Sequence, residues 1–190
     1  MSYDAIHLIS VFFAVLALAA AAGAVTLIAS KRARAVIDPN TALVLITCVA
    51  VTMMTGSLFY SEVAGFLPCK LCWVQRGFAY PGALWALYAT ARKKLNQWWV
   101  AALVGFGGLP VSIWHYLIQN FPELEKAGGA CDPRNPCSAA YLDTFGFITI
   151  PFMAGCGFLA IGVLALVWRR GLGKAAGDAG EEEADGKTQS

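Results

Sequence analysis

Long apolar runs separated by short polar segments dominate the chain. Crossing a bilayer takes roughly 20 mostly apolar residues per helix. Five stretches rich in Ala, Leu, Val, Ile and aromatic residues meet this need, at residues 5–30, 41–62, 73–91, 97–118 and 147–168. None alternates apolar and polar residues with a period of two, so the pattern predicts helices and not barrel strands. We therefore predict one all-α integral membrane domain with five spans.

Composition and charge support this class and predict an orientation. The chain is 58% hydrophobic and 14% charged, whereas a soluble domain averages about 25% charged residues. Ten of the 14 Lys and Arg residues fall on one side of the predicted spans, in segments 31–34, 92–94 and 169–187. Because cytoplasmic loops carry the excess of basic residues, the N-terminus is predicted outside and the C-terminus inside.

The two ends of the chain need separate interpretation. The run 5–30 begins with Met1-Ser2-Tyr3-Asp4, and its basic cluster follows the apolar stretch. This order favours an uncleaved N-out helix over a cleaved signal peptide, which needs a positive start. Segment 171–190 is rich in Gly, Ala and Glu, which predicts a disordered cytoplasmic tail.

The positions of the six cysteines point to redox chemistry. Two lie at the outer mouth of the third span (Cys69, Cys72), two in the second outer loop (Cys131, Cys137), and two within spans (Cys48, Cys156). The first four face the oxidising compartment as close pairs, and disulfides persist there. The last two are expected to be small buried side chains outside the chemistry.

The first pair has the stronger chemical signal. A Cys-x-x-Cys at a helix N-terminus favours a thiolate, which we assign to Cys72. Cys72, Arg76 and Tyr80 are spaced by four residues, so they share one helix face. Arg76 either stabilises an anion there, such as the thiolate or a bound electron acceptor, or reaches back to the lipid headgroups.

The second pair and one polar cluster allow more than one interpretation. Cys131 and Cys137 lie in a loop able to meet a partner protein, but they could also form a purely structural disulfide. A zinc site built from all four outer thiols is a further alternative. His115 and Gln119, four residues apart at the outer end of the fourth span, share the depth of Cys72 and are candidate redox-site residues.

The motifs together resemble the DsbB/BdbC disulfide bond formation family. The similarity rests on the segment from Cys69 to Arg76 followed by Tyr80-Pro81, on the second outer pair, on His115 with Gln119 and Pro122, and on Gly146-Phe147-Ile148-Thr149-Ile150-Pro151. It covers residues 41–170 and implies a four-helix transmembrane bundle, to which 5–30 adds one helix. The membrane domain is then 1–170, followed by the tail 171–190.

The resemblance implies a protein-dithiol:quinone oxidoreductase of the bacterial inner membrane. Such proteins reoxidise a soluble DsbA-like thiol oxidase and pass electrons to ubiquinone or menaquinone. The implied roles are attack by the partner at Cys131, exchange of Cys137 with Cys69, and quinone reduction at Cys72 beside Arg76. His115 and Gln119 would line the quinone site, and no metal is implied.

Two departures and two rival functions remain open at this point. Helix 5–30 lies outside the family core, and only five residues separate Cys131 from Cys137, so their reach to Cys69 is in question. One rival is another redox enzyme, either a conveyor of electrons outward or a vitamin-K-epoxide-reductase-like enzyme. The other is a non-catalytic membrane protein whose outer cysteines are structural disulfides or zinc ligands.

Overall fold

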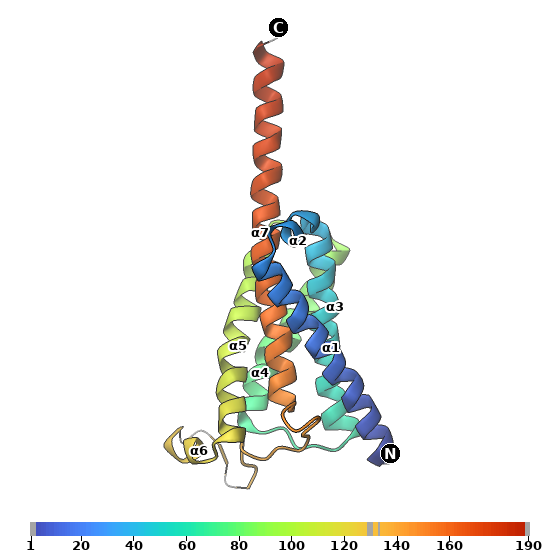
Figure 1. The fold of residues 1–190 in the computed structure, drawn as a ribbon, viewed down its shortest axis with the longest axis vertical. Helices are drawn as coiled ribbons and strands as arrows, with labels where there is room; N and C mark the ends of the chain where they lie inside the picture. The colour runs from blue at the N-terminus through green and yellow to red at the C-terminus, as the bar shows by residue number, and fades with distance from the viewer. Residues whose placement is uncertain (1–2, 129–130, 133, 189–190) are drawn as a thin grey trace.

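The described structure is helical, as predicted. The computed structural model describes residues 3–128, 131–132 and 134–188. Its elements are α1 (Tyr3–Ala29), α2 (Lys31–Val36), α3 (Pro39–Leu58), the π-helical turn η1 (Phe59–Val63), α4 (Lys70–Ala91), α5 (Trp98–Asn120), α6 (Glu123–Gly128) and α7 (Ile150–Thr188). The N-terminus, α6 and the loops before α4 and α7 lie at one end of the bundle, and α2 lies at the other (Figure 1).

Four helices are long and apolar enough to cross a membrane. Within the described residues these are Asp4–Ala29, Pro39–Val63, Trp98–Asn120 and Ile150–Lys174. Helix α4 has 22 residues, but Lys70, Gln75 and Arg76 make it more polar than the other four. It nevertheless packs against α3 and α5 in the same bundle. The span predicted at 73–91 stays a prediction.

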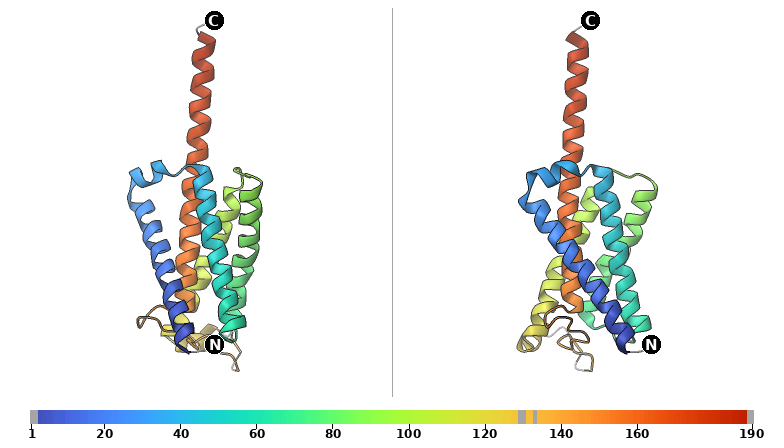
Figure 2. Two further views of the ribbon diagram at one scale, coloured as in Figure 1. Left: turned by 90° about the vertical axis from the view of Figure 1, so that its right-hand side faces the viewer. Right: turned by 45° about the vertical axis from the view of Figure 1, so that its right-hand side comes forward.

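Helix α7 forms the centre of the bundle. It packs against α1, α3 and α5, while α4 packs against α3 and α5 (Figure 2). The backbones of α5 and α7 meet at Gly105, where an added Cβ would lie 2.5 Å from Gly162 Cα. Small residues of this kind let membrane helices come into backbone contact. The two glycines therefore fix α5 and its polar outer end next to α7.

The connection from α1 to α3 reverses the chain tightly. The Ser30 side chain accepts a hydrogen bond from Ala33 N–H at the start of α2. Asp38 caps α3 by accepting from the N–H groups of Asn40 and Thr41, with Pro39 as the first helical residue. Ser and Asp are favoured caps, and proline is tolerated in the first turn. Consequently α3 runs back along the bundle, antiparallel to α1, while α1 packs against α7 and runs in the same direction as α7.

The last part of α7 differs from the prediction for segment 171–190. The helix continues to Thr188 and projects beyond the rest of the bundle (Figure 1). Ala and Glu, which are frequent in this segment, are strong helix formers. The composition of the segment predicts disorder from its low hydrophobicity, whereas the structure continues the helix through it. Residues 189–190 lie outside the described residues.

Candidate functional site

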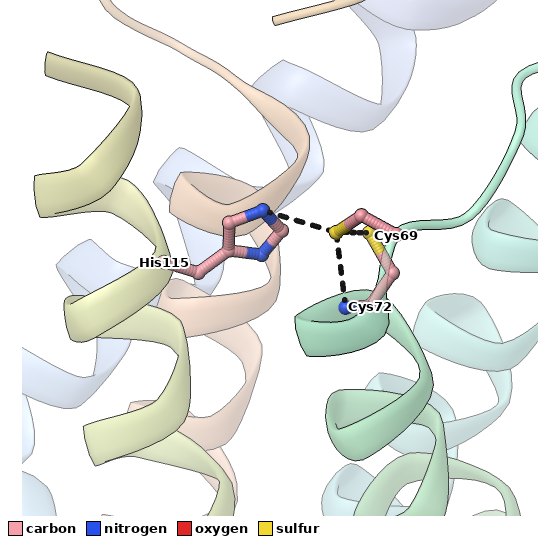
Figure 3. Close-up of side chains that lie close together, drawn as sticks. All are labelled: Cys69, Cys72 and His115. Atoms are coloured by element: carbon pink, nitrogen blue, oxygen red, sulfur yellow. Dashed lines mark hydrogen bonds between the residues drawn. The ribbon is translucent and has the colours of Figure 1, made fainter. Parts of the chain in front are cut away.

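The inner cysteine pair forms the start of α4. Cys69 is the N-cap, and its Sγ accepts a hydrogen bond of 3.4 Å from the Cys72 backbone N–H. The two Sγ atoms lie 3.0 Å apart and both thiols are free (Figure 3). Backbone donors at a helix N-terminus stabilise a negatively charged cap. The sequence prediction that this pair lies at a helix N-terminus is confirmed.

His115 of α5 lies beside Cys69 from the opposite side. Its Nε2 is 3.4 Å from Cys69 Sγ, and the residue is only 1% exposed (Figure 3). Its Nδ1 is buried and has no hydrogen-bond partner among the described residues. A buried imidazole in contact with sulfur can donate to a thiolate or accept the proton of a thiol.

These contacts favour Cys69 as the thiolate of the reduced pair. The hydrogen bond with the Cys72 thiol lowers the pKa of Cys69 well below its ordinary value, and the hydrogen bond with His115 lowers it further, against the opposing effect of burial. The sequence pattern assigned the thiolate to Cys72. In the structure, the groups that stabilise a thiolate contact Cys69 instead.

Arg76 is held inside the bundle by α3. Its Nε donates to Ser57 Oγ at 3.0 Å, and its Nη2 donates to the Ser57 carbonyl oxygen at 3.1 Å. The guanidinium carbon lies 5.2 Å from the Trp73 ring centre and 5.7 Å from that of Tyr80. This geometry favours the anion-stabilising role over contact with the headgroups. The contacts of the described residues engage two of the five N–H donors that an arginine carries.

A cavity of about 350 Å³ lies next to this arginine. Cys72 and Arg76 line it together with Ser57, and apolar side chains of α1, α3, η1 and α7 form most of the remaining wall. Ligand pockets have this character, with an apolar lining and a few placed polar groups. The cavity can therefore hold a flat apolar molecule with a polar atom directed at Cys72 and Arg76.

His115 and Gln119 were both predicted to line the redox site, but neither residue lines this cavity. His115 contacts Cys69 at the inner cysteine pair. The Gln119 side chain donates from Nε2 to the Ala139 carbonyl oxygen at 3.3 Å, in the outer loop. The structure thus brings Cys69, Cys72 and His115 together and leaves Gln119 with the loop.

The outer cysteines form a disulfide in the loop after α6. Cys131 and Cys137 are bonded, with Cα atoms 5.8 Å apart. Cys137 is fully buried, whereas Cys131 is partly exposed. The Glu125 carboxylate accepts hydrogen bonds of 2.6 Å from the Cys137 N–H and of 2.6 Å from Ser138 Oγ. The loop is therefore fixed at its Cys137 end.

The two pairs share one buried cluster. Cys69 and Cys137 pack together with Leu71 and Ile118, and Cys72 and Cys131 lie at the edge of the same cluster. The Asn135 side chain also donates from Nδ2 to the Pro68 carbonyl oxygen at 3.1 Å, so the outer loop is attached next to Cys69. The short spacing of the outer pair thus does not keep it away from the inner pair.

Sequence reasoning missed the residues that support the reactive groups. Ser57 holds Arg76, Glu125 holds the outer loop, and Gln75 donates to Ser112 Oγ at 2.9 Å between α4 and α5. For Ser57 and Gln75, a polar residue within an apolar span is the sequence feature that could have pointed to them. Of the two cysteines expected to be buried, Cys156 is buried, but that expectation is wrong for Cys48, which is exposed.

Comparison with known proteins agrees with this site. Residues 39–168 match the family model described as "Disulfide bond formation protein DsbB". A "Probable disulfide formation protein" of Oceanobacillus iheyensis is 43% identical over 134 residues, which cover 70% of this chain and 92% of that protein.

Two further relatives are similar over shorter stretches. The "Probable disulfide formation protein C" of Bacillus cereus is 42% identical over 112 residues, covering 59% of this chain and 80% of that protein. The "Disulfide bond formation protein C" of Bacillus subtilis is 40% identical over 113 residues, covering 60% and 81%. No solved structure matches the chain. The family match over most of the bundle and the paired cysteines within it show that this chain belongs to the DsbB family of disulfide bond formation proteins.

Proposed function

We propose that the chain is a membrane protein-dithiol:quinone oxidoreductase that reoxidises a soluble DsbA-like thiol oxidase. The observation that carries the proposal is the continuous arrangement of partly exposed Cys131, buried Cys137 and Cys69, and cavity-lining Cys72. Thiol–disulfide exchange requires each thiolate to reach the next sulfur. This order leads from the protein surface to an apolar cavity.

The outer disulfide receives electrons from the partner. A thiolate of the partner attacks Cys131, the more accessible sulfur, and Cys137 leaves as a thiolate. The second partner thiol then attacks the mixed disulfide, which releases the oxidised partner and leaves Cys131 and Cys137 reduced. Two electrons and two protons have moved from the partner to the outer pair.

The inner pair receives these electrons by the same chemistry. When Cys69 and Cys72 are joined, Cys137 attacks Cys69 and Cys72 leaves. Cys131 then attacks Cys137, which restores the outer disulfide and leaves the inner pair reduced. The packing of Cys137 and Cys69 in one buried cluster supports this direct exchange.

The residues of the cavity fit a quinone as the electron acceptor. Its volume of about 350 Å³ and apolar lining suit a flat ring, and Arg76 supplies N–H donors for an oxygen gaining negative charge. The bound acceptor would take two electrons and two protons and leave as a quinol. Cys72 faces the cavity, and Cys69 lies 3.0 Å behind it, placed to close the disulfide as those electrons leave. The same slot suits ubiquinone and menaquinone.

We also propose five spans with the N-terminus outside, in the inner membrane of a bacterium. Helix α4 completes a bundle in which four helices are apolar enough to span. The start of α4 and the loop before α7, which carry the two cysteine pairs, lie at the end opposite α2 with its basic residues (Figure 1). Because basic residues mark the cytoplasmic side, the cysteines would face the periplasm or the cell exterior.

Anaerobic stopped-flow absorbance tests the relay. Reduced DsbA-like oxidase and a soluble quinone analogue are mixed with wild type, Cys72→Ser and Arg76→Ala. We expect one quinone reduced per partner oxidised, complete loss in Cys72→Ser and slower reduction in Arg76→Ala. A wild-type protein that oxidises the partner without reducing quinone would refute the quinone step.

A second candidate function is metal binding by the inner pair. Ligand atoms of Cys69, Cys72 and His115 lie within 4.8 Å of one another, and thiolate and imidazole are zinc ligands. Elemental analysis of the purified protein distinguishes the two functions. One zinc per chain, lost in His115→Ala and accompanied by no thiol turnover, would favour the metal site.

A further inference from the structure

Helix α1 lies outside residues 39–168 that match the family model, yet it forms one wall of the cavity. Four of its side chains line the cavity, namely Phe13, Leu16, Ala17 and Ala20. Cys72 and Arg76 line it from α4. In Figure 1, α1 crosses α7 and its N-terminal half approaches the end of α3 that leads into η1.

We propose that α1 is a specificity-determining wall of the acceptor site, which sets the shape of quinone that this protein accepts. The inference rests on the proposed function, because it takes the cavity as the quinone site. It assigns a role to the one predicted span that the family core does not contain.

Phe13 gives the wall that α1 contributes to the cavity an aromatic surface. Its ring lies 6.0 Å from the ring of Tyr60 and 6.2 Å from that of Phe59. A Cβ at Gly56 would lie 3.2 Å from the Phe13 ring, so the ring rests on a position that a larger residue would obstruct. Tyr60 in turn stacks on Phe66. Aromatic surfaces of this kind suit a flat conjugated ring.

Leu16 marks where the cavity meets the outside of the bundle. It lines the cavity and is 37% exposed, so an apolar tail could leave beside α1 into the bilayer. All four cavity-lining residues of α1 are apolar, whereas the polar groups at the reactive end, Cys72, Arg76 and Ser57, belong to α3 and α4. Changes in α1 should therefore alter acceptor binding and leave the thiol exchanges unaffected.

Protection from alkylation measures binding without turnover. Leu16→Cys and Leu18→Cys form a matched pair, because the two leucines are 37% and 39% exposed and only Leu16 lines the cavity. Each variant is treated with N-ethylmaleimide in the absence of the partner, with and without a fully substituted benzoquinone carrying a decyl tail. Mass spectrometry quantifies alkylation at positions 16 and 18. We expect saturable protection at position 16 alone.

Steady-state kinetics with Phe13→Ala and Phe12→Ala gives an independent readout. Phe12 is the adjacent residue, is 59% exposed and does not line the cavity. With the partner saturating, Phe13→Ala should raise KM for the quinone analogue by roughly tenfold, since it removes an apolar contact with the ligand. KM for the partner should stay unchanged in both variants, and Phe12→Ala should match wild type.

The outcomes separate this inference from the function on which it rests. If wild type reduces the quinone but positions 16 and 18 are protected equally and Phe13→Ala leaves KM unchanged, α1 has no role in acceptor binding and only this inference fails. If wild type reduces no quinone and the analogue protects neither position, the proposed function fails as well.

Discussion

The two cysteine pairs are held in opposite electrostatic surroundings. The inner pair caps a helix, with His115 3.4 Å from Cys69 Sγ and Arg76 one turn beyond Cys72. The outer disulfide lies in a loop whose Cys137 end is fixed by the carboxylate of Glu125. One pair is surrounded by groups that stabilise a thiolate, and the other lies beside a negative charge that disfavours one.

This difference supports the proposed direction of electron transfer. A disulfide is a stronger oxidant when its reduced, thiolate form is stabilised. The helix N-terminus and His115 stabilise the reduced inner pair, whereas Glu125 makes thiolate formation at Cys137 less favourable. Electrons should therefore pass from the outer pair to the inner pair.

The largest expected effect is an all-or-none cross-link between the pairs. Cys72→Ser with Cys131→Ser leaves one cysteine of each pair, Cys69 and Cys137, which pack in the same buried cluster; Cys48 and Cys156 also remain. Mild oxidation with diamide should convert most of this double variant to the Cys69–Cys137 disulfide, measured by peptide mass spectrometry.

The matched control keeps the other cysteine of each pair. Cys69→Ser with Cys137→Ser leaves the two thiols at the edge of the cluster, and we expect far less cross-linking there. If the first double variant forms no Cys69–Cys137 bond, the outer loop does not deliver its electrons directly to Cys69.

The next effect concerns the thiolate of the inner pair. Contacts with Cys72 and His115 lower the pKa of Cys69, so its thiolate persists at a lower pH than the thiolate of an ordinary cysteine. His115→Ala removes one cause and should raise the pH midpoint by about one unit, which is about 1.4 kcal/mol of lost thiolate stabilisation. Thiolate absorbance at 240 nm against pH, in the reduced protein, measures the midpoint.

His7 provides the control for this titration. It is the only other histidine of the chain and lies exposed near the start of α1. His7→Ala should leave the midpoint unchanged. An unchanged midpoint in His115→Ala would show that the helix N-terminus and Cys72 alone stabilise the thiolate.

A smaller effect is expected at the outer pair. Glu125→Ala removes two hydrogen-bond acceptors at the Cys137 end of the loop. A net hydrogen bond contributes about 1 kcal/mol, so loss of the bond to the Cys137 N–H should let dithiothreitol reduce Cys131–Cys137 roughly fivefold faster. Quenched-flow alkylation followed by mass spectrometry gives the rate.

Two variants separate the charge of Glu125 from its hydrogen bonds. Glu125→Gln keeps an acceptor for the Cys137 N–H and removes the charge, so it should shift the redox equilibrium of the outer pair toward the dithiol with less effect on loop order. Glu123→Ala changes an exposed acid of the same helix and should behave as wild type. Equal rates in all three variants would mean that Glu125 does not distinguish the two pairs.

The sequence predicted the elements of this molecule better than their mutual contacts. Apolar runs and helix signals placed four of the spans and located Cys69 and Cys72 at a helix N-terminus, because these features are local. The contact between Arg76 and Ser57 joins residues 19 positions apart, and Glu125 reaches Cys137 across 12. Such contacts depend on how helices and loops pack, which periodicity does not specify. For the same reason the helix pattern alone assigns the thiolate to Cys72, because it does not show that His115 of α5 contacts Cys69.

The smallest effect is expected at Gln119, which the sequence spacing grouped with His115 on one face of α5. Gln119 lies one turn beyond His115, but its amide donates to Ala139 in the outer loop and does not line the cavity. Gln119→Leu should therefore change KM for the quinone analogue by less than about twofold, as expected for a substitution away from the ligand. It should also loosen the loop slightly, visible as faster hydrogen exchange around residue 139. A large rise in KM for the quinone analogue would place Gln119 at the acceptor site, where its spacing from His115 predicted it, and would mean that the outer loop and the cavity do not act as separate regions.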